Sequence, residues 1–361
     1  MLAVIARALR RVGLRRRGRV LLAAGALMLV VAVLVVVAAA WRGSTHSGPS
    51  AGPGSDCSER AAEVGSSQRT RKNPPDLTLS FDAEPAYCEW DSIQPGYACT
   101  NGSVDRASPA QPASAAFARD DSPGNVRAGR YSAQVVLAPG DHAAYSCGAE
   151  AVFAIKNLNE GEGSESWWAW SWKLPLGWRG TDSWGMLFEF TTNASLWPSY
   201  GMLNFDASSR DSLQLRLHTG LTPNPGSSSY KAAYEKKVTL LGPTAPRPMP
   251  YGKWLDFYMH VVWHSRSAGL LELWYRAEGQ QTFTKLYSDV PGGDALIQAA
   301  PHPTLLYNTA NGAPGENGKP ALELEGGFYR GNASWANEYW WDGMRRRQNE
   351  GAVVAGFPVP S

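Results

Sequence analysis

The sequence has little of what metal and nucleic-acid sites require. It contains only four cysteines, none of them in a CxxC or HxxxH spacing, so we expect no metal site built on them. Seven arginines lie between residues 7 and 19, and removing them leaves 27 basic and 32 acidic side chains. Because nucleic-acid binding needs a basic surface, this mildly acidic remainder excludes a nucleic-acid partner.

Repeats of fixed period and convincing amphipathic helices are also absent, which excludes propellers and solenoids. About thirteen short segments instead alternate apolar and polar residues, and Gly, Pro and Asn clusters separate them. This pattern predicts an all-β protein, a concanavalin-like jelly-roll sandwich of two antiparallel sheets. Residues 193–211 and 219–235 are turn-rich, and we interpret them as loops too polar for the core.

The N-terminal part is unlike a folded domain. Residues 1–19 form a basic segment, and 20–41 is an uncharged run long enough to span a bilayer as a single helix. We therefore expect a single-pass anchor in the cell membrane, a linker at 42–76, and an extracellular jelly-roll domain at 77–350. The alternative is a secreted protein, released by cleavage near Ala38–Ala40.

All four cysteines lie on the exported side of the predicted anchor, where thiols normally pair. Three connectivities are open. We favour Cys88 with Cys99 and Cys57 with Cys147, because the first pair closes a short, turn-rich loop.

The segment 254–264 alternates strictly. Leu255, Phe257, Met259, Val261 and Trp263 make one apolar face, which predicts a core strand. The other face carries Trp254 and Tyr258 together with His260 and His264. Exposed aromatic rings on a sheet are typical of sugar-binding surfaces, so this face predicts a polysaccharide partner.

Several segments resemble, in order, the heparin-lyase-I-like polysaccharide lyases, which are similar to glucuronan lyases. They are RAGRYSAQ (127–134), AEAVFAIK (149–156), GKWLDFYMHVVWHSRSAGLLELWYRAEG (252–279) and LELEGGFYRGNASWANEYWWDGMRR (322–346). The resemblance covers roughly residues 125–346. It implies a jelly roll whose concave sheet holds the polysaccharide, and cleavage by β-elimination.

The resemblance also implies site residues. In GGFYR, Tyr329 matches the tyrosine of a family Gly-x-Tyr strand and is expected to be a Brønsted acid or base. Glu189 and Thr191 stand where the family carries Gln-x-His, so Glu189 is a further candidate catalytic residue, of unclear role. Glu325 stands where a lysine is usual in the family.

The pattern of the residues themselves adds further candidates. His218 follows Arg216 by two residues on the polar side of a strand, which suits proton transfer beside carboxylate neutralisation. We expect Arg216 and Arg330 to bind the uronate carboxylate. A stacking platform for pyranose rings is predicted from Tyr339, Trp340 and Trp341.

These observations favour a lyase-like protein that cleaves an acidic, uronate-containing polysaccharide. The alternative is a non-catalytic carbohydrate-binding jelly roll at the cell surface. No cofactor is expected, although a structural Ca²⁺ in an Asp/Asn-rich loop stays open.

Overall fold

The computed structural model describes most of the chain from residue 76 to residue 358. The described ranges are 76–79, 81–82, 92–94, 97–100, 103–104, 117–139, 141–142, 149–155, 158, 160–181, 185–192, 203–209, 211–222, 233–308, 322–331 and 333–358. The predicted basic segment, the anchor at 20–41 and the linker up to residue 75 lie outside them. Within the described ranges, no helix has the length and apolar character needed to cross a membrane. Cys57, Cys88 and Cys147 are outside as well, and only the backbone of Cys99 is described, so the predicted disulfides stay predictions.

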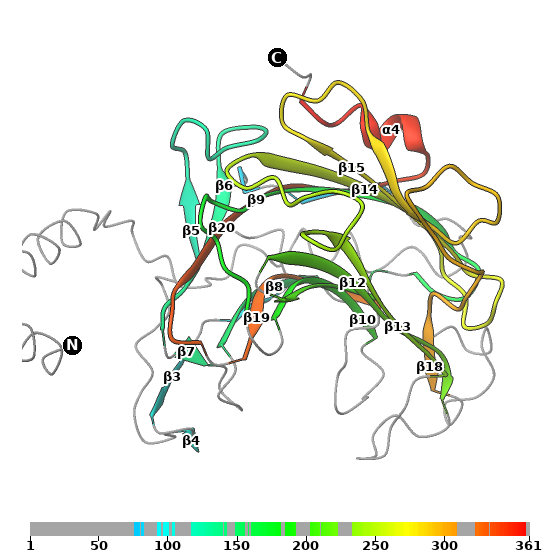
Figure 1. Cartoon of the computed structure of the whole chain (residues 1–361), viewed down its shortest axis with the longest axis horizontal. Helices are drawn as coiled ribbons and strands as arrows, with labels where there is room; N and C mark the ends of the chain where they lie inside the picture. The colour runs from blue at the N-terminus through cyan, green and yellow to red at the C-terminus, as the bar shows by residue number, and fades with distance from the viewer. Residues whose placement is uncertain are drawn as a thin grey trace, which may run out of the picture. The chain divides into compact units, whose positions relative to one another are not determined.

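Sheet A is the larger of two stacked sheets (Figure 1). Its strands pair in the order β17-β16-β15-β14-β9-β20-β6-β5, and β1 pairs with β20. Their bounds are β17 Ile297–Gln298, β16 Thr284–Ser288, β15 Leu270–Ala277, β14 Trp254–Val262, β9 Glu165–Lys173, β20 Asn337–Arg347, β6 Ser132–Leu137, β5 Phe117–Asp120 and β1 Leu77–Leu79.

Sheet B follows the order β13-β12-β11-β10-β19-β8-β2, and β18 pairs with β12. The bounds are β13 Tyr234–Leu241, β12 Ser212–Thr222, β11 Leu203–Ser209, β10 Gly185–Thr192, β19 Leu322–Arg330, β8 Ala149–Ile155, β2 Ser92–Gln94 and β18 Leu306–Asn308. A small third sheet joins β4 (Ser103–Val104), β3 (Tyr97–Thr100) and β7 (Asp141–His142). Among the described pairings, only β12 with β18 and β16 with β17 are parallel. The predicted all-β, two-sheet sandwich is thus confirmed.

The core lies between the two sheets and is rich in aromatic rings. Sheet A contributes Trp170 and Trp172, which pack against Phe188 and Phe205 of sheet B with ring centroids 4.9–6.4 Å apart. Strand alternation explains this, since every second residue of each strand faces the other sheet. Both sheets bend in the same sense, so the outer face of sheet B, which points away from sheet A, lies inside the bend (Figure 1).

The outer face of sheet A carries the predicted aromatic row, but the C-terminal segment covers it. Helix α4 (Glu350–Val354) begins at the capping residue Asn349, whose side chain accepts from the Ala352 N–H. Val353 and Phe357 pack against Tyr258 and Trp274, which are 3% and 8% exposed. The prediction that Trp254 and Tyr258 are exposed is therefore wrong, since they are 1% and 3% exposed. Tyr258 and Trp274 belong to a second, smaller core.

The two predicted outward histidines are held by acidic residues on or beside sheet A. His260 stacks on Trp167 with a centroid distance of 4.0 Å and lies between the carboxylates of Glu165 and Glu272, at 2.8 and 3.3 Å. The Nδ1 atom of His264 is 3.1 Å from Glu162. Both imidazoles thus contact carboxylates of neighbouring residues.

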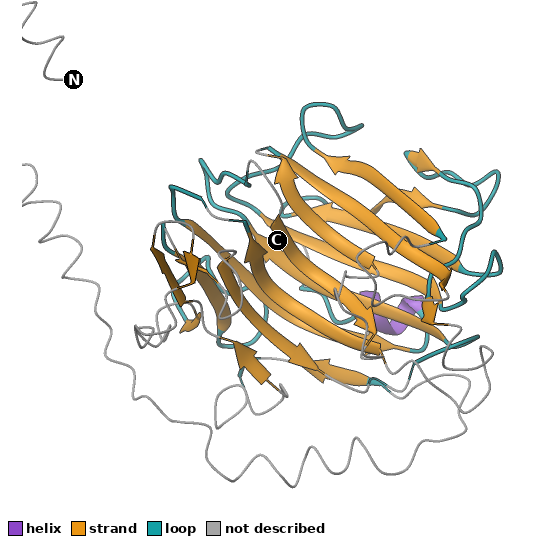
Figure 2. Ribbon diagram, turned by 90° about the horizontal axis from the view of Figure 1, so that it is seen from below, coloured by secondary structure: helices purple, strands orange, loops and turns teal. Residues whose placement is uncertain are grey.

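Strand β11 corrects a second expectation, because it lies inside the segment 193–211 that we interpreted as loop. Leu203, Phe205 and Ala207 are core residues with 0–1% exposure, and Asn204 and Asp206 alternate with them. This is the period of 2 expected of a half-buried strand. Figure 2 shows such strands running side by side across the molecule, with loops at their ends.

Candidate active site on the outer face of sheet B

A band of polar side chains crosses the outer face of sheet B. Strand register places the following residues opposite one another in sequence from β19 to β13: Glu325, Glu189, Asn204, Arg216 and Lys237. We call these five residues the polar row. Directly opposed residues have Cβ atoms only about 5 Å apart, so each member lies beside the next.

The members of the polar row point outward because their neighbours in sequence point inward. Leu215 and Leu217 flank Arg216 and are at most 1% exposed in the core. Glu189 and Asn204, at 6% and 7% exposure, are themselves largely buried on the outer side. Of the polar row, Glu189 and Asn204 are therefore desolvated, whereas Glu325 and Arg216 are half-buried and Lys237 is exposed. Electrostatic interactions at the two buried members are stronger than in water.

Arg216 and His218 occupy consecutive outward positions on β12. The Arg216 guanidinium pairs with the carboxylate of Asp206 at 2.9 Å, which orients it, and its side chain keeps 30% exposure. Burial lowers the pKa of His218, the nearby Arg216 lowers it further, and Glu235 and Asp206 oppose that shift. A half-buried imidazole with a lowered pKa is neutral at pH 7 and can accept a proton.

Tyr329 also lies on the outer face of sheet B, but far from His218. Gly327 has a φ of 120°, which L side chains rarely adopt, and the neighbouring pairing with β10 shifts register between Met186 and Phe188. The bulge places Tyr329 opposite Met186. Three strand spacings separate β19 from β12, about 14 Å, so Tyr329 and His218 cannot serve the same proton.

The other predicted site residues lie elsewhere. Arg330 is 0% exposed, and its guanidinium donates to the backbone carbonyls of Trp335 and Ala138 at 3.0 and 2.8 Å. Tyr339 and Trp341 are 0% exposed core residues. The prediction that Arg330 binds the substrate carboxylate is therefore wrong. Arg330 follows Tyr329 on the strand, so its side chain points to the opposite, inner face of sheet B.

Trp340 is separated from the polar row by the thickness of the sandwich. It points to the outer face of sheet A, where its indole donates to Asp120 at 2.7 Å and Lys173 lies 5.5 Å from its ring centroid. Tyr339, Trp340 and Trp341 thus cannot form one platform, since adjacent strand residues point to opposite faces.

Three members of the site escaped the sequence interpretation: Asn204, Asp206 and Lys237. The alternation in LNFDA was the signal that would have placed the first two on a strand face. Among the described residues, no group of three or more His, Cys, Asp or Glu side chains is arranged to hold a metal ion.

The outer face of sheet B thus presents a guanidinium, an imidazole, carboxylates and an amide side by side on neighbouring strands. The chain belongs to the polysaccharide lyase family, whose model matches residues 110–345. This confirms the family suggested by the sequence motifs.

Solved structures with a similar course of the chain include carbohydrate-active enzymes. An endo-β-1,4-glucuronan lyase from the fungus Trichoderma reesei is 12% identical, with 76% of this chain and 95% of that chain covered and a TM-score of 0.48. An alginate lyase from Aplysia kurodai is 10% identical (76% and 98% covered, TM-score 0.43). A glycoside hydrolase family 131 catalytic domain from Coprinopsis cinerea is 12% identical (75% and 92% covered, TM-score 0.43). No curated protein matches the chain.

Proposed function

We propose that this protein cleaves a uronate-containing polysaccharide by β-elimination on the outer face of sheet B. Membership of the polysaccharide lyase family supports the substrate class. The observation that carries the chemistry is the position of His218 two residues from Arg216 on one strand face, beside the polar row. An anionic substrate at the cell surface also agrees with the anchor predicted at 20–41.

Arg216 binds the carboxylate of the uronate and neutralises it, so that the negative charge developing next to C5 is stabilised. His218, neutral at pH 7, takes the C5 proton. The electron pair of the C5–H bond forms the C4=C5 double bond, and the C4–O bond breaks. The protonated imidazole then returns its proton to the leaving glycosidic oxygen, so one side chain is base and acid in turn.

Tyr329 contacts a different sugar unit of the chain in this arrangement. Its distance from His218 is comparable to the length of several sugar units, and its strand β19 belongs to the same curved sheet as β12 (Figure 1). Glu189 lies two strands from Arg216 in the polar row. We assign it to binding sugar hydroxyls, because a carboxylate accepts hydrogen bonds from them.

The test is the ultraviolet absorbance of unsaturated uronate ends released from polyglucuronate, alginate or heparin. We expect His218→Gln to lower turnover about 100-fold or more, the usual contribution of a general acid–base group, while binding persists. Arg216→Lys should raise KM and lower kcat together, because a lysine cannot form the two-pronged contact with a carboxylate.

Tyr329→Phe is the matched variant at the other end of the face and should keep turnover within about tenfold, the effect of one lost hydrogen bond. The opposite result, with full activity in His218→Gln and none in Tyr329→Phe, would show that Tyr329 rather than His218 is the proton-transfer residue.

A non-catalytic carbohydrate-binding role is the second candidate. One specific observation favours it: Glu189 and Thr191 fill the strand positions where the resembled lyases carry Gln and His. Binding to the same polysaccharides without any rise in absorbance would establish this role and exclude the lyase.

A further inference from the structure

Asn204 lies at the centre of the polar row, and its side chain is incompletely hydrogen-bonded. It is 7% exposed, and its Oδ1 atom has no hydrogen-bond partner. Leu203 and Phe205 on either side of it are core residues with 0% exposure, so the amide projects to the outer face of sheet B.

A buried amide oxygen without a donor is costly for the folded protein, and such atoms are rare. A side chain of similar size without polar atoms, such as leucine, would avoid this cost at the same position. The state of Asn204 therefore indicates that a donor reaches Oδ1 when a ligand is bound.

The neighbours of Asn204 indicate what the ligand is. Arg216 lies directly opposite it on β12 and Glu189 directly opposite it on β10. The Cβ atoms of Arg216 and Asn204 are thus about 5 Å apart. This separation is comparable to the width of one pyranose ring. A single uronate can place its carboxylate on Arg216 and direct a ring hydroxyl at Asn204.

We propose that Asn204 is a specificity-determining residue that accepts a hydrogen bond from an unsubstituted ring hydroxyl of the uronate held by Arg216. The substrate is then a polyuronate whose ring hydroxyls are not acetylated. This inference rests on the proposed function, since it takes the uronate at Arg216 as its starting point.

The first experiment changes the ligand. A polyuronate that the wild type binds, polyglucuronate or alginate, is compared with the same polymer after chemical O-acetylation, which removes the hydroxyl donors. We expect acetylation to weaken binding at least tenfold, measured by calorimetry on the cleavage-deficient His218→Gln variant, which keeps Asn204 and Arg216. Equal affinity for both forms would overturn the inference without any variant of Asn204.

The second experiment changes the residue. Asn204→Leu should bind the unacetylated polymer about tenfold more weakly, the effect of one hydrogen bond, yet unfold at the same temperature as the wild type or higher. Asn204→Asp keeps an acceptor at the position and should retain more of the affinity than the leucine variant. Wild-type affinity in Asn204→Leu would overturn the assignment.

Asn125→Leu is the matched control. The Asn125 amide is already partnered, since it donates to Asp120 at 2.9 Å and accepts from Lys173 at 3.0 Å on the side of sheet A. This variant should unfold at a lower temperature and bind normally. If the wild type neither binds nor cleaves any polyuronate, the proposed function fails. If it binds one but ignores acetylation and the Asn204 variants, only the present inference fails.

Discussion

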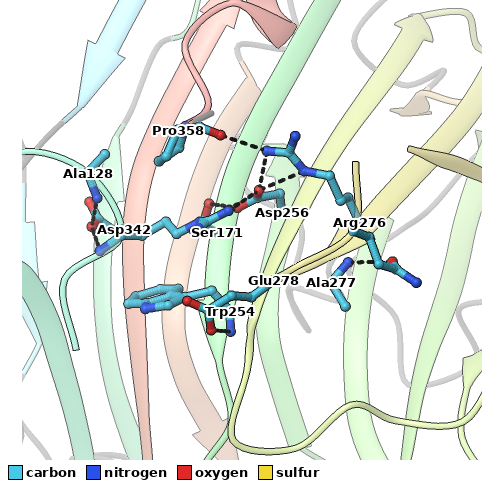
Figure 3. A network of polar contacts seen from close by, with 11 residues as sticks. Ala128, Ser171, Trp254, Asp256, Arg276, Ala277, Glu278, Asp342 and Pro358 are labelled. Atoms are coloured by element: carbon cyan, nitrogen blue, oxygen red, sulfur yellow. Dashed lines mark hydrogen bonds and ion pairs between the residues drawn. The ribbon is translucent and has the colours of Figure 1, made fainter. Parts of the chain in front are cut away.

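Replacing Asp256 with alanine would leave the buried Arg276 and the partly buried Arg127 without the carboxylate that both contact. Asp256 is 0% exposed and accepts from both Arg127 and Arg276 at 2.7 Å and from the Ser171 hydroxyl at 2.8 Å. Figure 3 shows Asp256 at the centre of this network, with Ser171 and Arg276 directed toward it. The same Arg276 donates to the carbonyl of Pro358 at 3.1 Å and so ties the C-terminal segment to sheet A.

The expected loss of stability follows from this burial. Removing one partner of a buried ion pair costs about 3–5 kcal/mol, because the remaining charge stays desolvated. The Arg127 and Arg276 side chains keep only 12% and 6% exposure, so neither can turn fully into water without moving its strand or loop. In a domain of this size we expect the thermal midpoint to fall by about 6–20 °C.

The assay is thermal unfolding followed by circular dichroism, and Asp294→Ala is the control. Asp294 also pairs with a cation, Lys285 at 3.1 Å, but it is 84% exposed, so its loss should leave the midpoint nearly unchanged. Combining Asp256→Ala with Arg127→Met should recover part of the loss, because one unpaired charge is then removed. A midpoint of Asp256→Ala within about 2 °C of the wild type would refute the reasoning.

Two further predictions concern the same side of the molecule. Burial raises the pKa of Asp342 to about 7, although it accepts from the backbone N–H groups of Arg127 and Ala128. The folded state therefore holds a proton between about pH 4 and pH 7 that the unfolded state has lost, and stability falls as pH rises through this window. We expect the unfolding free energy of Asp342→Asn, relative to the wild type, to increase from pH 4 to pH 7 in denaturant titrations; a constant difference would contradict the assignment. Phe357→Ala should cost up to about 3 kcal/mol and speed hydrogen exchange in α4 while leaving cleavage intact, and unchanged exchange would show that Phe357 does not hold the segment.

The sequence predicted strands well where alternation was strict and the apolar residues were large. The segment 254–264, predicted as a core strand, contains β14 (Trp254–Val262). The sequence prediction failed at β11, because Asn, Asp and two serines stand between and after its apolar residues and give the strand the composition of a loop. In β11 the alternation of apolar and polar residues mattered more than the residue composition, because burial of one face is sufficient to order a strand.

The candidate site was only partly predictable for a related reason. Arg216 and His218 could be placed on a polar strand face from alternation alone, and Glu189 was a candidate through the family resemblance. The structure brings Arg216 and Glu189 into one row. Which faces are covered could not be read in the same way. Tyr258 has the pattern of an exposed sugar-binding ring, but Val353 and Phe357, close to the C-terminal end of the described chain, cover it.

By itself, the sequence determined the all-β architecture, the family and the faces on which most polar residues lie, because these depend on local period and on ordered motifs. Tertiary structure alone decided which polar residues meet. Strand order separates Tyr329 from His218 and makes Asn204 a neighbour of Arg216. Such contacts join strands far apart in sequence, and their pairing is set by the register of the whole sheet rather than by any segment of the chain.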